Sequence, residues 1–194
     1  MKTYLFDIGN VLLAFDFSPA LNALMGSNPA PNAIQDIIAR KDAFEAGQIP
    51  VENYIAWASE LLDFGGDPDA FKHAWRHIFT PIEGTWKLAE QLKAEGHRLI
   101  LYSNTNAIHA SHCLDTYDVF KHFDHAVFSH EIGAIKPHDD FFTRSFDQFA
   151  ILPEQTYYID DLAENVAAGR AHGLNAHQYS ASNHQALLDW IATH

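Results

Sequence analysis

Short apolar runs separated by longer helical patterns limit the fold of this sequence more than any other feature. Four runs rich in β-branched or aromatic residues, each followed by polar or small residues, predict buried strands, and a fifth run is weaker. These predicted strands are Leu5–Phe6, Leu99–Tyr102, Ala126–Phe128, Tyr157–Ile159 and the weaker Asn175–Tyr179.

Helical spacing of apolar residues occupies the stretches between and after these strands. The predicted helices are Thr85–Glu95, Asn106–Asp115, Asp139–Phe149, Glu164–His172 and Ser182–Ile191. Gly96 and Gly173 follow two of them directly, as glycine often does at the end of a helix. Because strands alternate with helices, we expect right-handed crossovers and predict an α/β fold with a doubly wound parallel sheet.

The segment from residue 15 to residue 83 interrupts this alternation, because it has helical spacing but no convincing strand. Its predicted helices are Ala33–Arg40, Val51–Leu62 and Asp69–Phe79. A helical block inserted after the first strand is best placed as a lid over the carboxyl end of that strand. We therefore predict an α-helical cap over residues 15–83 and a core domain made of residues 1–14 and 84–194.

The charge of the chain argues against some classes of partner. It has 25 acidic and 12 basic residues, a formal net charge of −13, which disfavours nucleic acid and anionic membrane surfaces. No apolar run approaches the roughly 20 residues needed to cross a bilayer, and Asp7 comes too early for a signal peptide. The single cysteine, Cys113, is typical of a reducing compartment, so we expect a cytoplasmic protein, with monomer and homodimer both open.

Polar residues follow each of the four stronger strands. Asp7 comes directly after the first, Ser103–Thr105 after the second, Lys136 beyond the third, and Asp160–Asp161 after the fourth. In open parallel sheets, ligands bind beyond the carboxyl ends of the strands. The sequence therefore predicts that a carboxylate, a hydroxyl pair, a lysine and an acidic pair meet at one edge of the sheet.

This set of residues can carry out phosphoryl transfer. The carboxylate of Asp7 can attack phosphorus, since carboxylates are known covalent nucleophiles in such reactions. Two anions repel at that step, so a hard cation is needed, and Asp7, Asp161, the nearby Asp160 and the Gly9 carbonyl can supply oxygen ligands for Mg2+.

The phosphate group of a substrate needs its own partners. Ser103 or Thr105, with backbone N–H groups at a helix start, can hold phosphate oxygens, and Lys136 adds a fixed positive charge. These local cations allow a small phosphorylated molecule to bind despite the acidic composition of the chain.

Taken in order, the four segments resemble the four motifs of the haloacid dehalogenase (HAD) superfamily, and the helical insert resembles its α-helical cap. The segment Phe6–Val11, together with Ile159–Asp161 and Asn165, is similar to a branch that contains bacterial sugar-1-phosphate phosphatases and the phosphatase domain of soluble epoxide hydrolases. The resemblance implies a Rossmann-like core and a magnesium-dependent phosphatase that acts on a small phosphorylated metabolite through an aspartyl-phosphate.

The resemblance also implies a role for each matching residue. It makes Asp7 the nucleophile and a metal ligand, and Lys136 both a phosphate ligand and the residue that steadies Asp7. The remaining implied roles are phosphate binding by Ser103 and Asn104, and metal binding by Gly9 through its carbonyl and by Asp160 and Asp161.

The sequence departs from the superfamily pattern at Gly9. Most phosphatases of the superfamily have an aspartate there, which protonates the leaving oxygen and then activates water; such acid–base help is worth about 10²–10⁴-fold. Three readings are open: the branch manages without this group, Asp16 or a cap histidine replaces it, or the protein binds phosphate without hydrolysing it. We favour the first, with an anomeric hydroxyl as a leaving group that needs little protonation.

Two other functions stay open at this stage. A haloacid dehalogenase would use Asp7 and Lys136 without a metal, but would have no use for Asp160 and Asp161 together. A non-catalytic module that binds a phosphorylated ligand is the other alternative, and the missing side chain at Gly9 motivates it.

Overall fold

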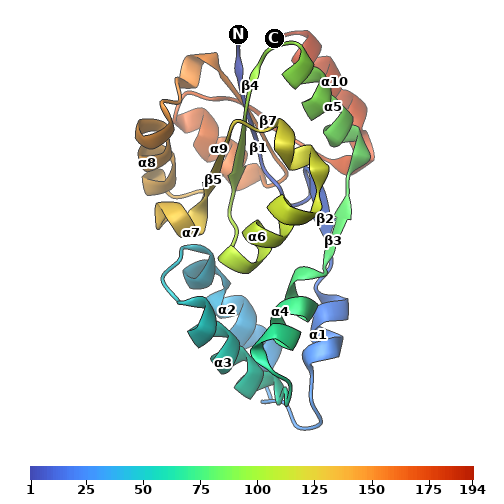
Figure 1. Ribbon diagram of the computed structural model, residues 1–194. Helices are drawn as coiled ribbons and strands as arrows, with labels where there is room; N and C mark the ends of the chain where they lie inside the picture. Colours follow the sequence, from blue (N-terminus) through green and yellow to red (C-terminus); the bar gives the residue numbers. More distant parts are fainter.

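The apolar runs form a five-stranded sheet in the computed structural model, which describes residues 1–194 (Figure 1). Its strands are β1 (Thr3–Phe6), β4 (Arg98–Ser103), β5 (His125–Phe128), β6 (Thr156–Asp160) and β7 (Asn175–Gln178). Their spatial order is β5-β4-β1-β6-β7, and every neighbouring pair is parallel. The predicted α/β fold with a doubly wound parallel sheet is confirmed, and each predicted strand boundary lies within two residues of the observed one.

The order of the strands places β1 at the point where the chain changes direction across the sheet. From β1 the chain moves outward through β4 to β5, and then returns to the other side of β1 to form β6 and β7. Phe6, the last residue of β1, lies between Leu101 and Ile159 in register. A crevice at the carboxyl ends of the strands is expected at such a switch point.

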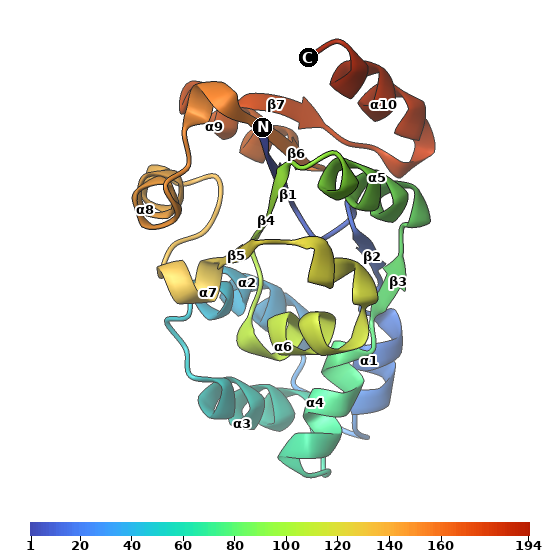
Figure 2. The ribbon, with the colours of Figure 1, turned by 45° about the horizontal axis from the view of Figure 1, so that its top comes forward.

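Helices cover both faces of the sheet (Figure 2). One face packs against α5 (Glu83–Ala94), α6 (Ala107–Thr116) and α10 (His184–Ala192). The other packs against α7 (Ser129–Ile132), α8 (Asp139–Phe149) and α9 (Ala163–Ala171). Because both faces are covered, both sets of alternating strand residues are apolar.

The five helices predicted in the core agree with the structure to within two residues at each end. Short elements were missed, because a single turn leaves no periodic pattern in the sequence. They are α7 and the three 3-10 turns, η1 (Asp118–His122), η2 (Pro153–Gln155) and η3 (Ala181–Asn183).

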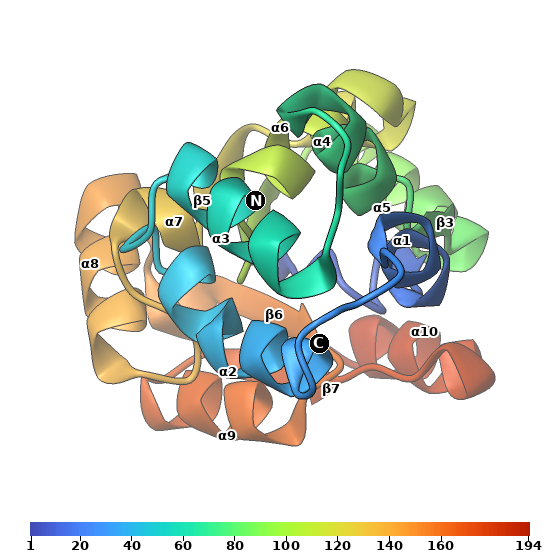
Figure 3. The same ribbon diagram turned by 90° about the horizontal axis from the view of Figure 1, so that it is seen from below.

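The segment after β1 forms four helices at the carboxyl end of the sheet (Figure 3). They are α1 (Ser18–Leu24), α2 (Ala33–Glu45), α3 (Val51–Leu62) and α4 (Pro68–Arg76), and they share an apolar cluster of their own. The sequence missed the short α1 and ended α2 five residues too early. We refer to α1–α4 as the cap helices, while the domain boundaries at residues 14/15 and 83/84 stay a prediction.

A two-stranded antiparallel ribbon joins the cap helices to the sheet domain. It pairs β2 (Leu13–Phe15) with β3 (Phe79–Pro81). The expectation that residues 15–83 contain no strand was therefore wrong. Three residues are too few to show the alternation that marks a strand, and Phe79 was assigned to the end of a helix that stops at Arg76. No helix of the structure has both the length and the apolar character needed to span a bilayer.

The turn after α2 holds the cap helices against the core. The Ser129 hydroxyl of α7 donates to the carbonyl oxygen of Glu45 at 2.5 Å. Gly47 follows with φ +69°, and a Cβ at this position would lie 2.3 Å from the carbonyl oxygen of His130. Only a glycine therefore lets the turn approach the backbone of α7 so closely.

We predict that Gly47→Ala destabilises the protein more than Gly96→Ala does. Gly96 also has a positive φ, +82°, but a Cβ there meets nothing within 4 Å, so it reports the backbone cost alone, about 1–2 kcal/mol. Gly47→Ala adds the steric conflict with His130. Urea unfolding of both variants measures the difference in unfolding free energy. Equal losses of unfolding free energy would show that a Cβ at position 47 does not clash with α7.

Candidate active site

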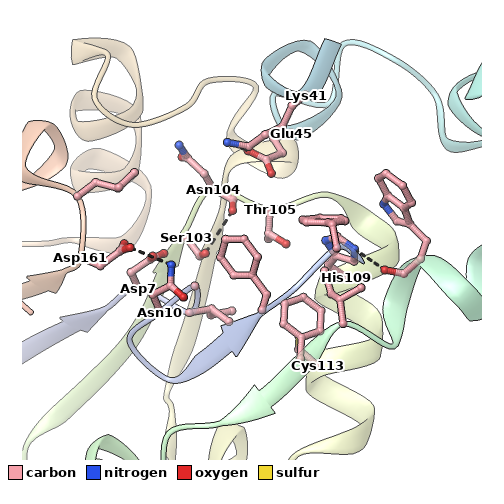
Figure 4. A pocket seen from close by; sticks show the side chains of 18 of the residues that line it. Asp7, Asn10, Lys41, Glu45, Ser103, Asn104, Thr105, His109, Cys113 and Asp161 are labelled. Carbon is pink, nitrogen blue, oxygen red and sulfur yellow. Dashed lines mark hydrogen bonds and ion pairs between the residues drawn. The ribbon is translucent and has the colours of Figure 1, made fainter. Parts of the chain in front are cut away.

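A pocket of about 460 Å³ lies at the carboxyl ends of the strands, between the sheet and the cap helices (Figure 4). Six of the seven predicted site residues line it. They are Asp7, Gly9, Ser103, Asn104, Lys136 and Asp161. The convergence expected from the strand ends is thus present in the structure, although Asp160 does not line the pocket.

Lys136 is the centre of the charged network. Its Nζ donates to Asp7 Oδ1 at 3.0 Å, to Asp160 Oδ2 at 2.6 Å and to the carbonyl oxygen of Tyr102 at 2.6 Å. The lysine side chain is only 1% exposed. Burial alone would lower the pKa of Lys136, but the charges of Asp160 and Asp7 raise it above its ordinary value, so the ammonium stays charged.

Both carboxylate oxygens of Asp160 are occupied by hydrogen bonds from other groups of the protein. Besides Lys136, its oxygens accept from the Tyr158 hydroxyl at 2.5 Å, the Leu162 N–H at 2.9 Å and the Asn165 Nδ2 at 3.0 Å. Burial would raise the pKa of Asp160, but Lys136 lowers it below its ordinary value. These contacts make Asp160 the anchor of Lys136, and a direct role in metal binding stays a prediction.

Asp7 has a different environment, because one side of it faces the pocket. Burial raises the pKa of Asp7 to about 7, although the charge of Lys136 opposes this shift. A buried carboxylate that keeps only one cationic partner is well suited to receive a second cation.

The residues around Asp7 fit a hard divalent cation. Asp7, Asp160 and Asp161 each offer an oxygen, and these oxygens all lie within 4.8 Å of one another. Asn165 adds an independent sign, because its Oδ1 is buried, has no hydrogen-bond partner and belongs to a residue that lines the pocket. Carboxylate, carbonyl and amide oxygens are the ligands that Mg2+ prefers. Asp7, Asp161 and the Gly9 carbonyl would hold the ion.

Asn165 belongs to the motif that resembles the HAD branch, but the sequence does not predict it as a site residue. It lies four positions after Asp161, in the first turn of α9, where the helix directs it back toward the strand end. Asn10 was also missed, and its Nδ2 donates to Asp161 Oδ2 at 3.1 Å. Asn10 follows the strand-end Asp7 by three positions, and Asn165 follows Asp161 by four. This short spacing is the only signal that the sequence carries for them.

The loop after β4 brings the hydroxyls of Ser103 and Thr105 to the pocket. Ser103 is 2% exposed; its hydroxyl donates a long hydrogen bond, 3.4 Å, to the carbonyl oxygen of Asn104, and its hydrogen bonding to Asp7 opposes the burial that raises the pKa of that carboxyl. The Asn104 side chain instead binds the backbone of Lys136, donating to its carbonyl at 2.9 Å and accepting from its N–H at 2.8 Å. The predicted phosphate contact of Asn104 therefore needs its backbone.

Gly9 has no room for the missing acid unless its neighbour moves. A Cβ at Gly9 would lie 3.1 Å from Cε1 of Phe15. The aromatic ring of Phe15 in β2 thus lies against Gly9, at the position where most phosphatases of the superfamily pattern carry an acidic side chain.

The residues suggested as replacements do not reach the pocket. Asp16 is exposed and accepts a hydrogen bond from the Ser18 N–H at 2.8 Å, and neither His73 nor His77 lines the pocket. His109 of the core does line it, but its two ring nitrogens contact Asn106 Nδ2 and the Trp75 carbonyl, each at 3.0 Å. Burial lowers the pKa of His109 to about 4, so this ring is neutral.

The wall opposite the strand ends is mostly apolar and comes largely from the cap helices and the ribbon. Its apolar members include Phe15, Phe17, Leu21, Ile34, Ile37, Ile38, Tyr54, Trp75, Ile78 and Phe79. Only Lys41 and Glu45 bring charge to this wall. Most charged side chains of the pocket therefore lie on its sheet side.

A family model described as haloacid dehalogenase-like hydrolase matches residues 1–173 of the chain. The protein belongs to the haloacid dehalogenase-like hydrolases. This confirms the resemblance that the four strand-end segments indicated. The match to the family model identifies the chain as a hydrolase of the HAD family.

Solved HAD structures share this fold. The enzyme BT-2542 of Bacteroides thetaiotaomicron, in complex with magnesium and inorganic phosphate, is 22% identical, with a TM-score of 0.77 over 93% of this chain and 95% of its own. A HAD-like hydrolase of Porphyromonas gingivalis is 20% identical, with a TM-score of 0.79 over 98% of both chains. L-2-haloacid dehalogenase of Xanthobacter autotrophicus, with chloropropionic acid covalently bound, is 15% identical, with a TM-score of 0.64 over 92% of this chain and 77% of its own.

We predict that Lys136→Met costs about 3–5 kcal/mol of unfolding free energy at pH 8, because Asp7 and Asp160 are left without a buried counter-charge. The variant's two carboxyls then hold protons in the folded state at a pH where the unfolded chain has lost them. Its deficit should therefore shrink as the pH is lowered toward 5. Urea unfolding in chelator at both pH values measures this, and a pH-independent deficit would contradict it.

We also predict that Mg2+ raises the melting temperature of the protein. An ion that binds only the folded state adds about 2.7 kcal/mol when present at a hundred times its Kd. Asp161→Asn should remove most of this shift, and Asp147→Asn, an exposed position outside the pocket, should leave it unchanged. Equal shifts in both variants would place the ion elsewhere.

Proposed function

We propose that this protein is a magnesium-dependent phosphatase that acts on a small phosphorylated metabolite through an aspartyl-phosphate on Asp7. One observation carries the proposal: Asp7 lies in a pocket beside the buried Lys136 ammonium, with Asp161 and the Ser103 hydroxyl on the same wall. A nucleophile, a fixed cation, a metal ligand and a phosphate ligand thus share one small volume.

The residues present suggest how a phosphate monoester would react. Lys136 holds Oδ1 of Asp7 at 3.0 Å, which fixes the orientation of the carboxylate toward the pocket. Ser103 can donate to a phosphate oxygen, and the Lys136 charge offsets the repulsion between carboxylate and phosphate. Magnesium, when bound, would supply the second positive charge that this approach needs.

The relatives support this proposal without deciding the substrate. BT-2542 was crystallised with magnesium and inorganic phosphate, which are the cofactor and the product of the reaction proposed for this pocket. The branch resemblance favours a sugar 1-phosphate as substrate. The apolar wall of the pocket favours, in contrast, a leaving group with an apolar surface.

A metal-independent haloacid dehalogenase is the second candidate, and the similar fold of the Xanthobacter enzyme is the observation in its favour. Such an enzyme would need Asp7 and Lys136 but no metal ion. The close approach of three carboxylates and the unpartnered Asn165 Oδ1 favour the phosphatase instead.

We predict phosphate release from at least one compound in a screen of sugar phosphates, aryl and alkyl phosphates and nucleotides, only when Mg2+ is present. Asp7→Asn should reduce the rate by about 10³-fold or more, because it removes the nucleophile. Beryllofluoride should inhibit the wild-type protein by occupying the place of the phosphoryl group on Asp7. Asp147→Asn is the matched control and should keep full activity.

Each alternative has its own signature in the same screen. Release of halide from a 2-haloacid that persists in chelator would identify a dehalogenase. Saturable binding of phosphate without release from any ester would identify a binding module. A preference for glucose 6-phosphate over glucose 1-phosphate would reject the anomeric leaving group.

A further inference from the structure

Glu45, the last residue of α2, brings a mostly buried carboxyl to the cap side of the pocket. Its side chain is 12% exposed, and it lines the same pocket as Asp7. Its Oε2 is buried and accepts no hydrogen bond, but it forms an ion pair with Lys41 Nζ at 3.6 Å. Figure 4 shows Lys41 and Glu45 reaching from the cap toward the loop with Asn104 and Thr105.

The backbone of Glu45 is fixed to the core at this point. Its carbonyl accepts from the Ser129 hydroxyl at 2.5 Å, and the same hydroxyl oxygen accepts from the Thr105 N–H at 2.9 Å. Ser129 therefore links the end of α2 to the loop after β4, which carries Ser103. Gly47 also lies close to the backbone of His130, where a Cβ would have no room. The backbone that carries the Glu45 carboxyl is thus held in a set position relative to the loop with Ser103.

The surroundings of Glu45 allow it to carry a proton near neutral pH. Burial raises the pKa of Glu45 to about 7; Lys41 opposes this, while Asp42 and Asp7 raise it further. Tyr54, packed nearby, stays a neutral phenol because burial and the charge of Glu45 raise its pKa. A carboxyl with a pKa near the working pH can both give and take a proton.

We propose that Glu45 is the general acid and base of this site, in the role for which position 9 has no side chain. The inference rests on the proposed phosphatase function and replaces the reading in which the site works without an acid. Asp16 and the cap histidines lie outside the pocket and His109 is neutral, which leaves Glu45 as the carboxyl on the cap side that can meet a leaving group.

The proton balance of the two steps is simple. As Asp7 attacks phosphorus, the bond from phosphorus to the leaving oxygen breaks, and the proton of the Glu45 carboxyl passes to that oxygen, so an alcohol departs. Water then attacks the phosphorus of the aspartyl-phosphate and gives a proton to the Glu45 carboxylate. The bond from phosphorus to Asp7 breaks, phosphate is released, and both side chains return to their initial states.

Glu45→Gln tests this role, because the amide keeps the size of the side chain but cannot supply an acidic proton. Two substrates of similar size separate catalysis from structure. Phenethyl phosphate releases an alkoxide that needs a proton, whereas para-nitrophenyl phosphate releases a stable phenolate. We predict that kcat/KM falls by about 10²–10⁴-fold for phenethyl phosphate and less than about tenfold for para-nitrophenyl phosphate.

Two further readouts follow from the same variant. Since the acid must be protonated, wild-type kcat/KM for phenethyl phosphate should fall above a pH of about 7, and Glu45→Gln should lack this limb. Since water activation is also lost, the variant should show a burst of nitrophenolate followed by slow turnover. Glu45→Asp keeps an acid and should recover part of the activity and the pH limb.

The controls separate failure of this inference from failure of the proposed function. Glu60→Gln, exposed on α3 and outside the pocket, should match the wild type, and circular dichroism checks that each variant folds. The role of Glu45 would be overturned if Glu45→Gln lost kcat/KM equally on both substrates or lost none on phenethyl phosphate. It would also be overturned if the wild type were inactive on phenethyl phosphate alone. Activity that survives Asp7→Asn, or no phosphate release from any compound of the screen, these two esters included, would instead reject the phosphatase.

Discussion

The ammonium of Lys136, held between Asp7 and Asp160, is the interaction on which the rest of the site depends. Two carboxylates that are 11% and 0% exposed would repel each other strongly without it, and either would be costly to bury alone. The lysine comes from the loop that follows β5 and α7, and Asn104 fixes its backbone with two hydrogen bonds. Asp160 is in turn held by Tyr158 and Asn165, so one network connects four strand ends.

The cap helices complete this site rather than merely covering it. Their apolar wall displaces water from the side opposite the charges, which strengthens the electrostatic interactions of the sheet side. Phe15 lies against Gly9, and the end of α2 brings the Glu45 carboxyl to the cap side of the pocket. The acid and the nucleophile would then belong to different parts of the structure, joined through Ser129. In such an arrangement, substrate binding and proton transfer both depend on how α2 meets α7.

The apolar wall also bears on the substrate. A sugar has hydroxyl groups around its ring, and each one buried without a partner lowers affinity. The polar groups that the cap side offers are few, with Lys41 and Glu45 the charged ones. If Glu45 serves as the acid, the site no longer requires a leaving group as acidic as an anomeric hydroxyl. The range of esters would then extend beyond the sugar 1-phosphate that the branch resemblance suggests.

The sequence alone determined the parallel sheet and the core helices to within two residues, because burial on both faces and helical periodicity are local patterns. It also placed Asp7, Ser103, Lys136 and Asp161 at one edge, since parallel strands all end there. Only the tertiary structure decided how these residues are used. Internal hydrogen bonds occupy Asp160, Phe15 lies against Gly9, and one carboxylate oxygen of Glu45 accepts no hydrogen bond. These features arise from contacts between segments far apart in the chain, whose relative placement depends on packing and leaves no periodic signal in the sequence.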